Sequence, residues 1–117
     1  EAGDIAVHST RAVGTDVGIT GSAMREGATV PTHKNTKGLV RAFDVRTGKL
    51  LWTFNTIPRP GDFGNDTWEK ESWAVNGNTG VWTQITADEE LGLVSLPVET
   101  PSSDFYAGHR PGNNLFA

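Results

Sequence analysis

The chain has 117 residues, enough for one small domain, and its 36% hydrophobic and 21% charged content is ordinary for a globular protein. Ten basic against 14 acidic residues give a formal charge of −4, which argues against a nucleic-acid partner, and the lack of cysteine excludes disulfides and thiolate metal sites. Fourteen glycines and six prolines indicate many turns, so the composition favours an all-β fold.

The first third of the chain divides into two strand-like segments and a loop. Residues 4–7 and 17–20 are short and rich in β-branched side chains, and they are predicted to be two strands around a turn at residues 14–16. Residues 22–38 carry Gly, Pro, Thr, Asn and charge with little periodicity, which predicts a long loop. Loops of this length are often functional.

Two apolar runs at residues 39–43 and 50–54 predict a β-hairpin. Asp44 begins the connection and can accept hydrogen bonds from the turn backbone. Gly48 can supply the positive φ that closes the turn. Trp52 would then pack back across the pair of strands.

A second turn of the same form runs from Asp88 to Gly92, between residues 82–86 and residues 93–96. The turns begin 44 residues apart, a spacing that suits one four-stranded propeller blade. Two copies alone leave a propeller and a generic β-sandwich equally open. Between the two hairpins, residues 58–66 form a loop rich in Pro and Gly.

Three segments resemble the quinoprotein dehydrogenases, enzymes that use pyrroloquinoline quinone (PQQ). Residues 42–52, AFDVRTGKLLW, resemble the tryptophan-docking motif in which an Ala, an Asp, a Thr-Gly and a Trp recur in each blade. Residues 56–68 and 104–117 resemble the membrane-type quinoprotein glucose dehydrogenases. The resemblance implies an all-β quinoprotein alcohol dehydrogenase-like propeller. Residues 1–117 would form about two of its roughly eight blades and would be incomplete at both ends.

The resemblance also implies a function. The parent protein would oxidise a glucose-type aldose or an alcohol, transfer hydride to PQQ, and pass electrons to ubiquinone or a cytochrome. Its expected location is the bacterial periplasm, where an inner-membrane anchor in the parent is compatible with the family. Because the docking motif occurs in cofactor-free propellers too, a protein-binding scaffold is the alternative.

A site for PQQ needs an aromatic platform, hydrogen bonds to the cofactor's carboxylates and a cation that polarises its reactive carbonyl. In the family, the platform Trp stands six residues before the Asp of the second hairpin turn, a position held here by Trp82. Backbone groups of Met24 and Arg25 are expected to reach the cofactor carboxylates. Without the resemblance, Trp82 would be interpreted as a core aromatic of the blade. The remaining tryptophans are expected to be structural: Trp52, Trp68 and Trp73.

The metal implied by the resemblance is calcium or magnesium, which prefers oxygen ligands. Glu26 follows a Gly-Ser strand end and occupies the carboxylate position. The second ligand falls at Ser102, twenty residues beyond Trp82, with Thr100 as the competing assignment. The alternatives are a solvated glutamate in a polar loop and hydroxyls that cap a turn.

No catalytic residue is assigned, because the family's base lies in a His-His-Asp segment expected beyond residue 117. Asp104 is therefore predicted to be a loop carboxylate near the pocket. Arg110 is expected to fix its loop through hydrogen bonds to carbonyls. His8 and His33 show no metal-ligand spacing and are expected to be exposed.

Overall fold

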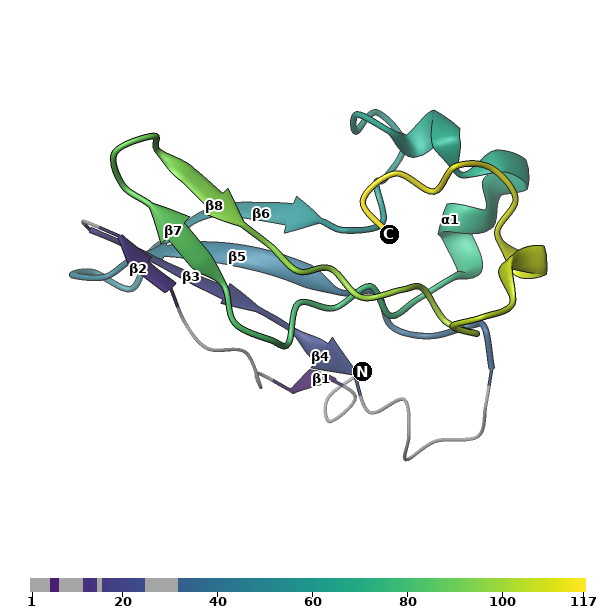
Figure 1. Cartoon of the computed structure of the whole chain (residues 1–117), viewed down its shortest axis with the longest axis horizontal. Helices are drawn as coiled ribbons and strands as arrows, with labels where there is room; N and C mark the ends of the chain where they lie inside the picture. Colours follow the sequence, from purple (N-terminus) through teal and green to yellow (C-terminus); the bar gives the residue numbers. More distant parts are fainter. Residues whose placement is uncertain (1–4, 7–11, 15, 25–31) are drawn as a thin grey trace.

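A computed structural model of the chain describes residues 5–6, 12–14, 16–24 and 32–117, and the side chains at 5–6, 12–13 and 23–24 are not described. The described ranges are mostly antiparallel strands with little helix (Figure 1). The prediction of an all-β fold is therefore confirmed. Within these ranges, every helix is too short or too polar to cross a membrane.

The largest sheet has four antiparallel strands in the order β2, β3, β5, β6. These strands are Ala12–Gly14, Val17–Gly21, Leu39–Asp44 and Leu50–Asn55. The central strands β3 and β5 alternate in burial, with one side chain facing the core and the next facing outward, as expected for a sheet with one covered face.

The predicted pairing at the start of the chain is wrong. Gly14 pairs with Val17, so the first hairpin joins β3 to β2 and not to residues 4–7. β1 (Ile5–Ala6) instead pairs with β4 (Ala23–Met24), inside the stretch predicted to be loop. The turn at residues 14–16 joins the two strands directly beside it, β2 and β3. β1 therefore pairs with β4, which lies further along the chain.

The hairpin of β5 and β6 has the predicted turn. The Asp44 carboxylate accepts hydrogen bonds from the backbone N–H of Arg46 at 3.0 Å, the backbone N–H of Thr47 at 2.7 Å and the Thr47 hydroxyl at 2.8 Å. The bonds from Thr47 hold the pKa of Asp44 below its usual value. Gly48 closes the turn with φ 72°.

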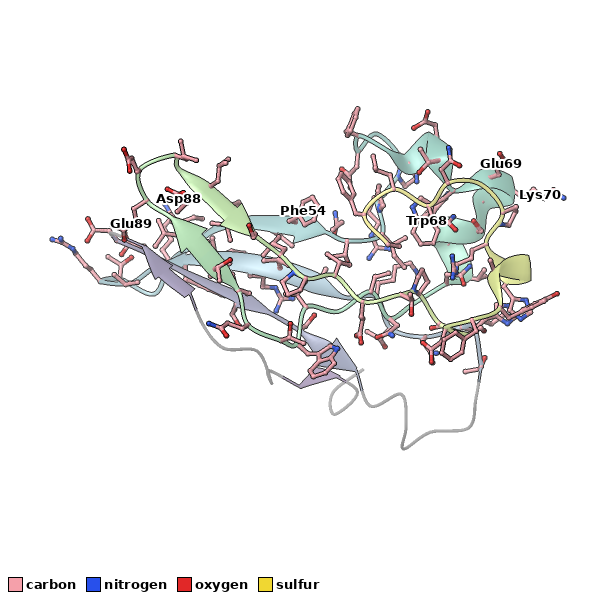
Figure 2. All side chains as sticks on the ribbon, in the orientation of Figure 1. Phe54, Trp68, Glu69, Lys70, Asp88 and Glu89 are labelled. Carbon is pink, nitrogen blue, oxygen red and sulfur yellow. The ribbon has the colours of Figure 1, made fainter. Side chains whose placement is uncertain are left out.

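The second hairpin repeats this design between β7 (Thr86–Asp88) and β8 (Leu93–Ser95). The Asp88 carboxylate accepts a hydrogen bond from the backbone N–H of Leu91 at 2.9 Å, and Gly92 has φ 66°. The predicted recurrence of one turn type is therefore confirmed. In Figure 2, Asp88 lies at the turn end of this hairpin, far from the helical segments.

The hydrophobic core lies between the four-stranded sheet and the second hairpin, which crosses it in Figure 1. Full burial of one Val or Ile side chain stabilises a fold by roughly 1.5–3 kcal/mol. The buried apolar cluster joins β3 and β5 to the segment before β7: Ile19, Val40, Ala42, Val81 and Ile85. Residues 81–85 are thus held against the sheet, which fixes the backbone around Trp82.

Trp52 is more exposed than packing across the hairpin predicts, and its structural role between adjacent blades stays a prediction. It lies opposite Ala42 in the hairpin, yet it is 42% exposed. β6 is an edge strand of the sheet, so no described strand pairs along its outer side. Leu50 and Leu51 on the same strand are exposed as well.

In the second half of the chain, which the structure describes throughout, four short helical turns lie where no helix was predicted. Trp68 is 2% exposed, and its indole N–H donates to the carbonyl of Leu115 at 3.4 Å. Figure 2 shows Trp68 between the helical turns and the C-terminal loop, consistent with its expected structural role. The helical turns are η2 (Asn65–Thr67), η3 (Glu69–Glu71), α1 (Ser72–Val75) and η4 (Ala107–His109).

Candidate functional site

Three stretches of chain meet beside the core at residues 34–38, 76–82 and 98–102. Asn78 is the centre of this junction, because it forms isolated bridges with Lys37 on one side and with Pro101 on the other. Its carbonyl accepts from the N–H of Gly38 at 2.6 Å, and its own N–H donates to the carbonyl of Thr36 at 2.9 Å. The junction therefore ties the loop after β8 to the segment before β7.

Trp82 emerges at the end of the second stretch and is 48% exposed. The residue before it, Val81, is fully buried and donates its N–H to the carbonyl of Ser22 at 2.9 Å. The exposed indole of Trp82 is therefore attached to a backbone that packing and a hydrogen bond at Val81 hold in place. A large, half-exposed aromatic face on a firm base is suited to stacking on a planar ligand.

The predicted contacts of Met24, Arg25 and Glu26 are only partly within the described structure. Met24 ends β4, and its backbone lies two residues beyond Ser22, which is bonded to the Trp82 segment. Arg25 and Glu26 lie outside the described residues. The strand leading to them therefore runs beside the segment that carries Trp82.

The two candidate hydroxyl ligands lie on the loop after β8 in different surroundings. Ser102 is fully buried, and its hydroxyl accepts a hydrogen bond from the side-chain amide of Asn35 at 2.8 Å. Thr100 is exposed, and its hydroxyl donates to the Asp104 carboxylate at 3.2 Å. Exposure therefore favours Thr100 as the hydroxyl that a ligand reaches without a change in the loop.

Glu99, which sequence reasoning missed, lies between these groups. Its carboxylate accepts a hydrogen bond from the N–H of Gly80 at 3.1 Å, and its own N–H donates to the carbonyl of Gly80 at 3.0 Å. Burial raises the pKa of Glu99, and hydrogen bonding to its carboxylate opposes the rise. No motif marks this residue; its only signal in the sequence is its place next to Thr100.

Asp104 and Arg110 behave as loop residues. The Arg110 guanidinium donates to the carbonyl of Asp104 at 3.2 Å and to the side-chain oxygen of Asn114 at 3.1 Å. This agrees with the prediction that Arg110 fixes the loop. Asp104 is exposed, and its carboxylate accepts a hydrogen bond from the Thr100 hydroxyl. Asp104 therefore lies beside the candidate site.

The prediction that His33 is exposed is wrong. His33 is half-buried and stacks on His109, with ring centroids 4.3 Å apart and planes at 14°. Tyr106 meets His109 edge-on at 4.9 Å. The partner ring comes from a loop more than seventy residues away, which no local pattern reveals. His8 lies outside the described residues.

In the part of the chain that the structure describes, no three His, Asp or Glu side chains converge on a possible metal position. The predicted metal ligands are Glu26 and a hydroxyl of the 98–102 loop. The structure describes the loop, whereas Glu26 lies outside the described residues. The flat face of Trp82 and the exposed Thr100 hydroxyl fit a planar polar cofactor with a bound cation. The donor types, carboxylate and hydroxyl oxygen, fit calcium or magnesium.

The family model and the relatives that match this chain are all quinoprotein dehydrogenases. A family model described as the β-propeller domain of glucose/ethanol/alcohol dehydrogenases (PQQ) matches residues 1–117. The chain is 33% identical over 73 residues to the glycerol dehydrogenase large subunit of Gluconobacter oxydans, covering 62% of this chain and 9% of that protein. It is 32% identical over 77 residues to the quinoprotein glucose dehydrogenase of Escherichia coli, covering 66% and 9%.

A third relative is the dehydrogenase subunit of the Gluconobacter oxydans alcohol dehydrogenase (quinone). The chain is 35% identical to it over 97 residues, which cover 68% of this chain and 13% of that protein. The matched regions therefore span about a tenth of the length of these relatives. The names of the relatives include a polyol, a sugar and an alcohol enzyme, so they do not select one substrate.

Proposed function

Because this chain belongs to the β-propeller domain family of the PQQ-dependent glucose, ethanol and alcohol dehydrogenases, we propose that it builds one side of the PQQ site of such an enzyme. The substrate class is a glucose-type aldose or an alcohol. The chain is similar to enzymes named for both, and the choice between them depends on residues that contact the substrate. Glucose is the first substrate to test, because residues 56–68 and 104–117 resemble the quinoprotein glucose dehydrogenases.

One observation carries this proposal: the half-exposed Trp82 lies two residues after Gly80, and Gly80 is hydrogen-bonded to Glu99 in the loop that bears Thr100 and Ser102. A protein-binding scaffold has no need for an exposed aromatic platform beside a loop that carries a carboxylate and an exposed hydroxyl. A site for a flat polyacid needs such an arrangement. The cluster also lies at the junction of three loop segments, where binding residues are commonly found.

In this proposal each residue has a limited role. Trp82 supports one face of the cofactor, and backbone groups of Met24 and Arg25 bind its carboxylates. Glu26, with Thr100 or Ser102, holds calcium or magnesium. When bound, the quinone supplies the hydride acceptor, and the metal ion supplies the Lewis acid. No residue of this chain is assigned as the catalytic base.

The electron acceptor and location complete the proposal. Several relatives carry an acceptor in their names, quinone in most of these and cytochrome c in one. We assign a quinone such as ubiquinone, or a cytochrome, to the protein that carries this chain. The bacterial periplasm is the proposed compartment, and any membrane association would come from parts other than residues 1–117.

Metal-dependent PQQ binding tests this function. In equilibrium dialysis, the protein that carries this chain should retain PQQ when calcium or magnesium is present, and should lose most of it after treatment with EDTA. Carboxylate and hydroxyl oxygens of the chain would hold the metal ion, and the bound ion would supply positive charge that attracts the acidic cofactor. A stably folded protein that retains no PQQ with either metal would contradict the proposal and favour the scaffold alternative.

A further inference from the structure

A cavity of about 230 Å³ lies between the end of β6 and the C-terminal loop. Figure 1 shows the C-terminus beside the loop that leaves β6. Phe54 meets Phe116 edge-on with ring centroids 5.0 Å apart, and Phe63 lies 6.5 Å from Phe116 on a tilted plane. Phe63 is 83% exposed, so this aromatic cavity opens to solvent on that side. The other lining residues are Thr53, Asn55, Pro58 and Asp62.

Asp62 supplies negative charge to this cavity. Its Oδ2 atom accepts hydrogen bonds from the backbone N–H of Arg59 at 2.9 Å and from the Asn55 side-chain amide at 3.1 Å. These two bonds hold the pKa of Asp62 below its usual value, so the carboxylate is ionised near neutral pH. No hydrogen bond from the described residues reaches Oδ1 of Asp62 or Oδ1 of Asn55. Two oxygen acceptors of the lining residues are therefore free to bind a ligand.

These groups select a cation as the ligand. The ionised Asp62 repels an anion, and the free oxygens of Asp62 and Asn55 need a partner that donates hydrogen bonds. A cation within about 6 Å of an aromatic centroid is also attracted by the negative face of the ring. A guanidinium group meets these demands best, because it is planar, stacks on aromatic faces and carries five N–H donors.

Both sides of the cavity are held in place by hydrogen bonds within the chain. Pro58 is fully buried, and its carbonyl accepts a hydrogen bond from the Asn65 side chain at 2.9 Å. On the other side, the N–H of Leu115 donates to the Thr67 hydroxyl at 2.8 Å, which holds the residue before Phe116. Walls that are formed in advance lower the entropy cost of binding.

The size of the cavity limits its occupant. Pockets for drug-sized ligands span about 300–1,000 Å³, so this smaller cavity suits one side chain or a small ion. The chain's own Arg59 is not among the lining residues, and within the described ranges its guanidinium forms no ion pair with Asp62. A small ion would leave most of the exposed Phe63 ring in water, whereas a docked protein surface would cover it.

We propose that this cavity is a docking site for one arginine side chain of a partner protein. The guanidinium group stacks on the phenylalanine rings and donates to the free oxygens of Asp62 and Asn55. Arginine is enriched among the interface residues that contribute most to binding. None of the lining residues belongs to the proposed PQQ site, so this docking site does not depend on the proposed function.

The test uses the protein that carries this chain and the peptide acetyl-Gly-Arg-Gly-amide, with binding measured by saturation-transfer difference NMR at constant ionic strength. The arginine peptide should bind saturably. The same peptide with citrulline, which has the shape of arginine without its charge, should bind at least about tenfold more weakly, because hydrogen bonds between charged groups are the stronger ones. Equal binding of the two peptides, or no binding of either, would overturn the proposal.

A second probe, ethylguanidinium chloride, separates a protein partner from a free cation. Ethylguanidinium should compete with the arginine peptide for the cavity. If ethylguanidinium binds and the arginine peptide does not, the cavity takes a free small cation, and docking of a protein side chain is wrong.

Variants of the lining residues locate the binding. Asp62→Asn should weaken binding of the arginine peptide about tenfold, because it removes the charge and keeps an oxygen. Phe63→Leu should weaken it about threefold, because it keeps an apolar side chain and removes the aromatic face. The matched control is Asp66→Asn, since Asp66 is exposed in η2 and is not a lining residue. It should leave the affinity unchanged.

Equal affinities of Asp62→Asn and Asp66→Asn would contradict recognition by the Asp62 carboxylate. Urea unfolding midpoints show whether each variant is folded. If Asp62→Asn proves unstable, Phe63→Leu decides the outcome, because its side chain is largely exposed and contributes little to the core. PQQ affinity should be the same in all three variants, which separates this result from a test of the proposed function.

Discussion

Replacing Trp82 with alanine should weaken PQQ binding by about 5- to 150-fold in the protein that carries this chain. Stacking of a flat heteroaromatic ring on an aromatic side chain is worth about 1–3 kcal/mol, and alanine removes it entirely. Stability should change less than affinity, because Trp82 is 48% exposed and is not among the buried residues of the core. Fluorescence titration or equilibrium dialysis with PQQ measures the affinity.

Phe63 provides the matched control for this result. It is a large aromatic that is 83% exposed, and it lies in the loop before the helical turns. Phe63→Ala should leave the PQQ dissociation constant unchanged. If Trp82→Ala and Phe63→Ala have the same effect, or if Trp82→Ala has none, Trp82 is not the platform.

Gly21→Ala should destabilise the fold and disturb the site at once. A Cβ at Gly21 would overlap the backbone carbonyl and the side chain of Val81, the residue before Trp82. Backbone atoms cannot swing away as a flexible side chain can. Overpacking of this kind typically costs about 1–3 kcal/mol, so the urea midpoint should fall clearly, and PQQ affinity should fall with it.

Gly18→Ala on the same strand is the control. Its Cβ would meet the Val45 side chain at 3.4 Å, an ordinary contact. The expected change in stability is within about 0.5 kcal/mol. Similar midpoints for the two variants would show that the end of β3 does not press against Val81, and the described junction would then be wrong.

The features predicted correctly from the sequence are those set by residues close to one another along the chain. Asp44 and Gly48 determine a hairpin within a few residues, since one carboxylate and one positive φ are enough to set the turn. The same features at Asp88 and Gly92 predicted the second hairpin. By contrast, the pairing of Ile5–Ala6 with Ala23–Met24 depends on strands separated by another hairpin, and no turn residue specifies it.

The candidate site was predictable only in part, for a similar reason. Trp82, Thr100 and Ser102 were located through the family resemblance, but the sequence could not show that Ser102 is buried and bonded to Asn35, more than sixty residues away. Glu99 was missed because its partner Gly80 lies on the other side of the β7–β8 hairpin in the sequence. Contacts of that separation follow from packing, which a single sequence does not display.

A crystal structure of the protein that carries this chain, grown with PQQ and calcium, tests the central claim most directly. The cofactor ring is expected to stack on the Trp82 indole at about 3.5–4.0 Å, the usual contact distance between carbon atoms. The N–H of Gly80 should still be bonded to the Glu99 carboxylate. PQQ bound elsewhere, with the Trp82 face left open to solvent, would contradict the central claim.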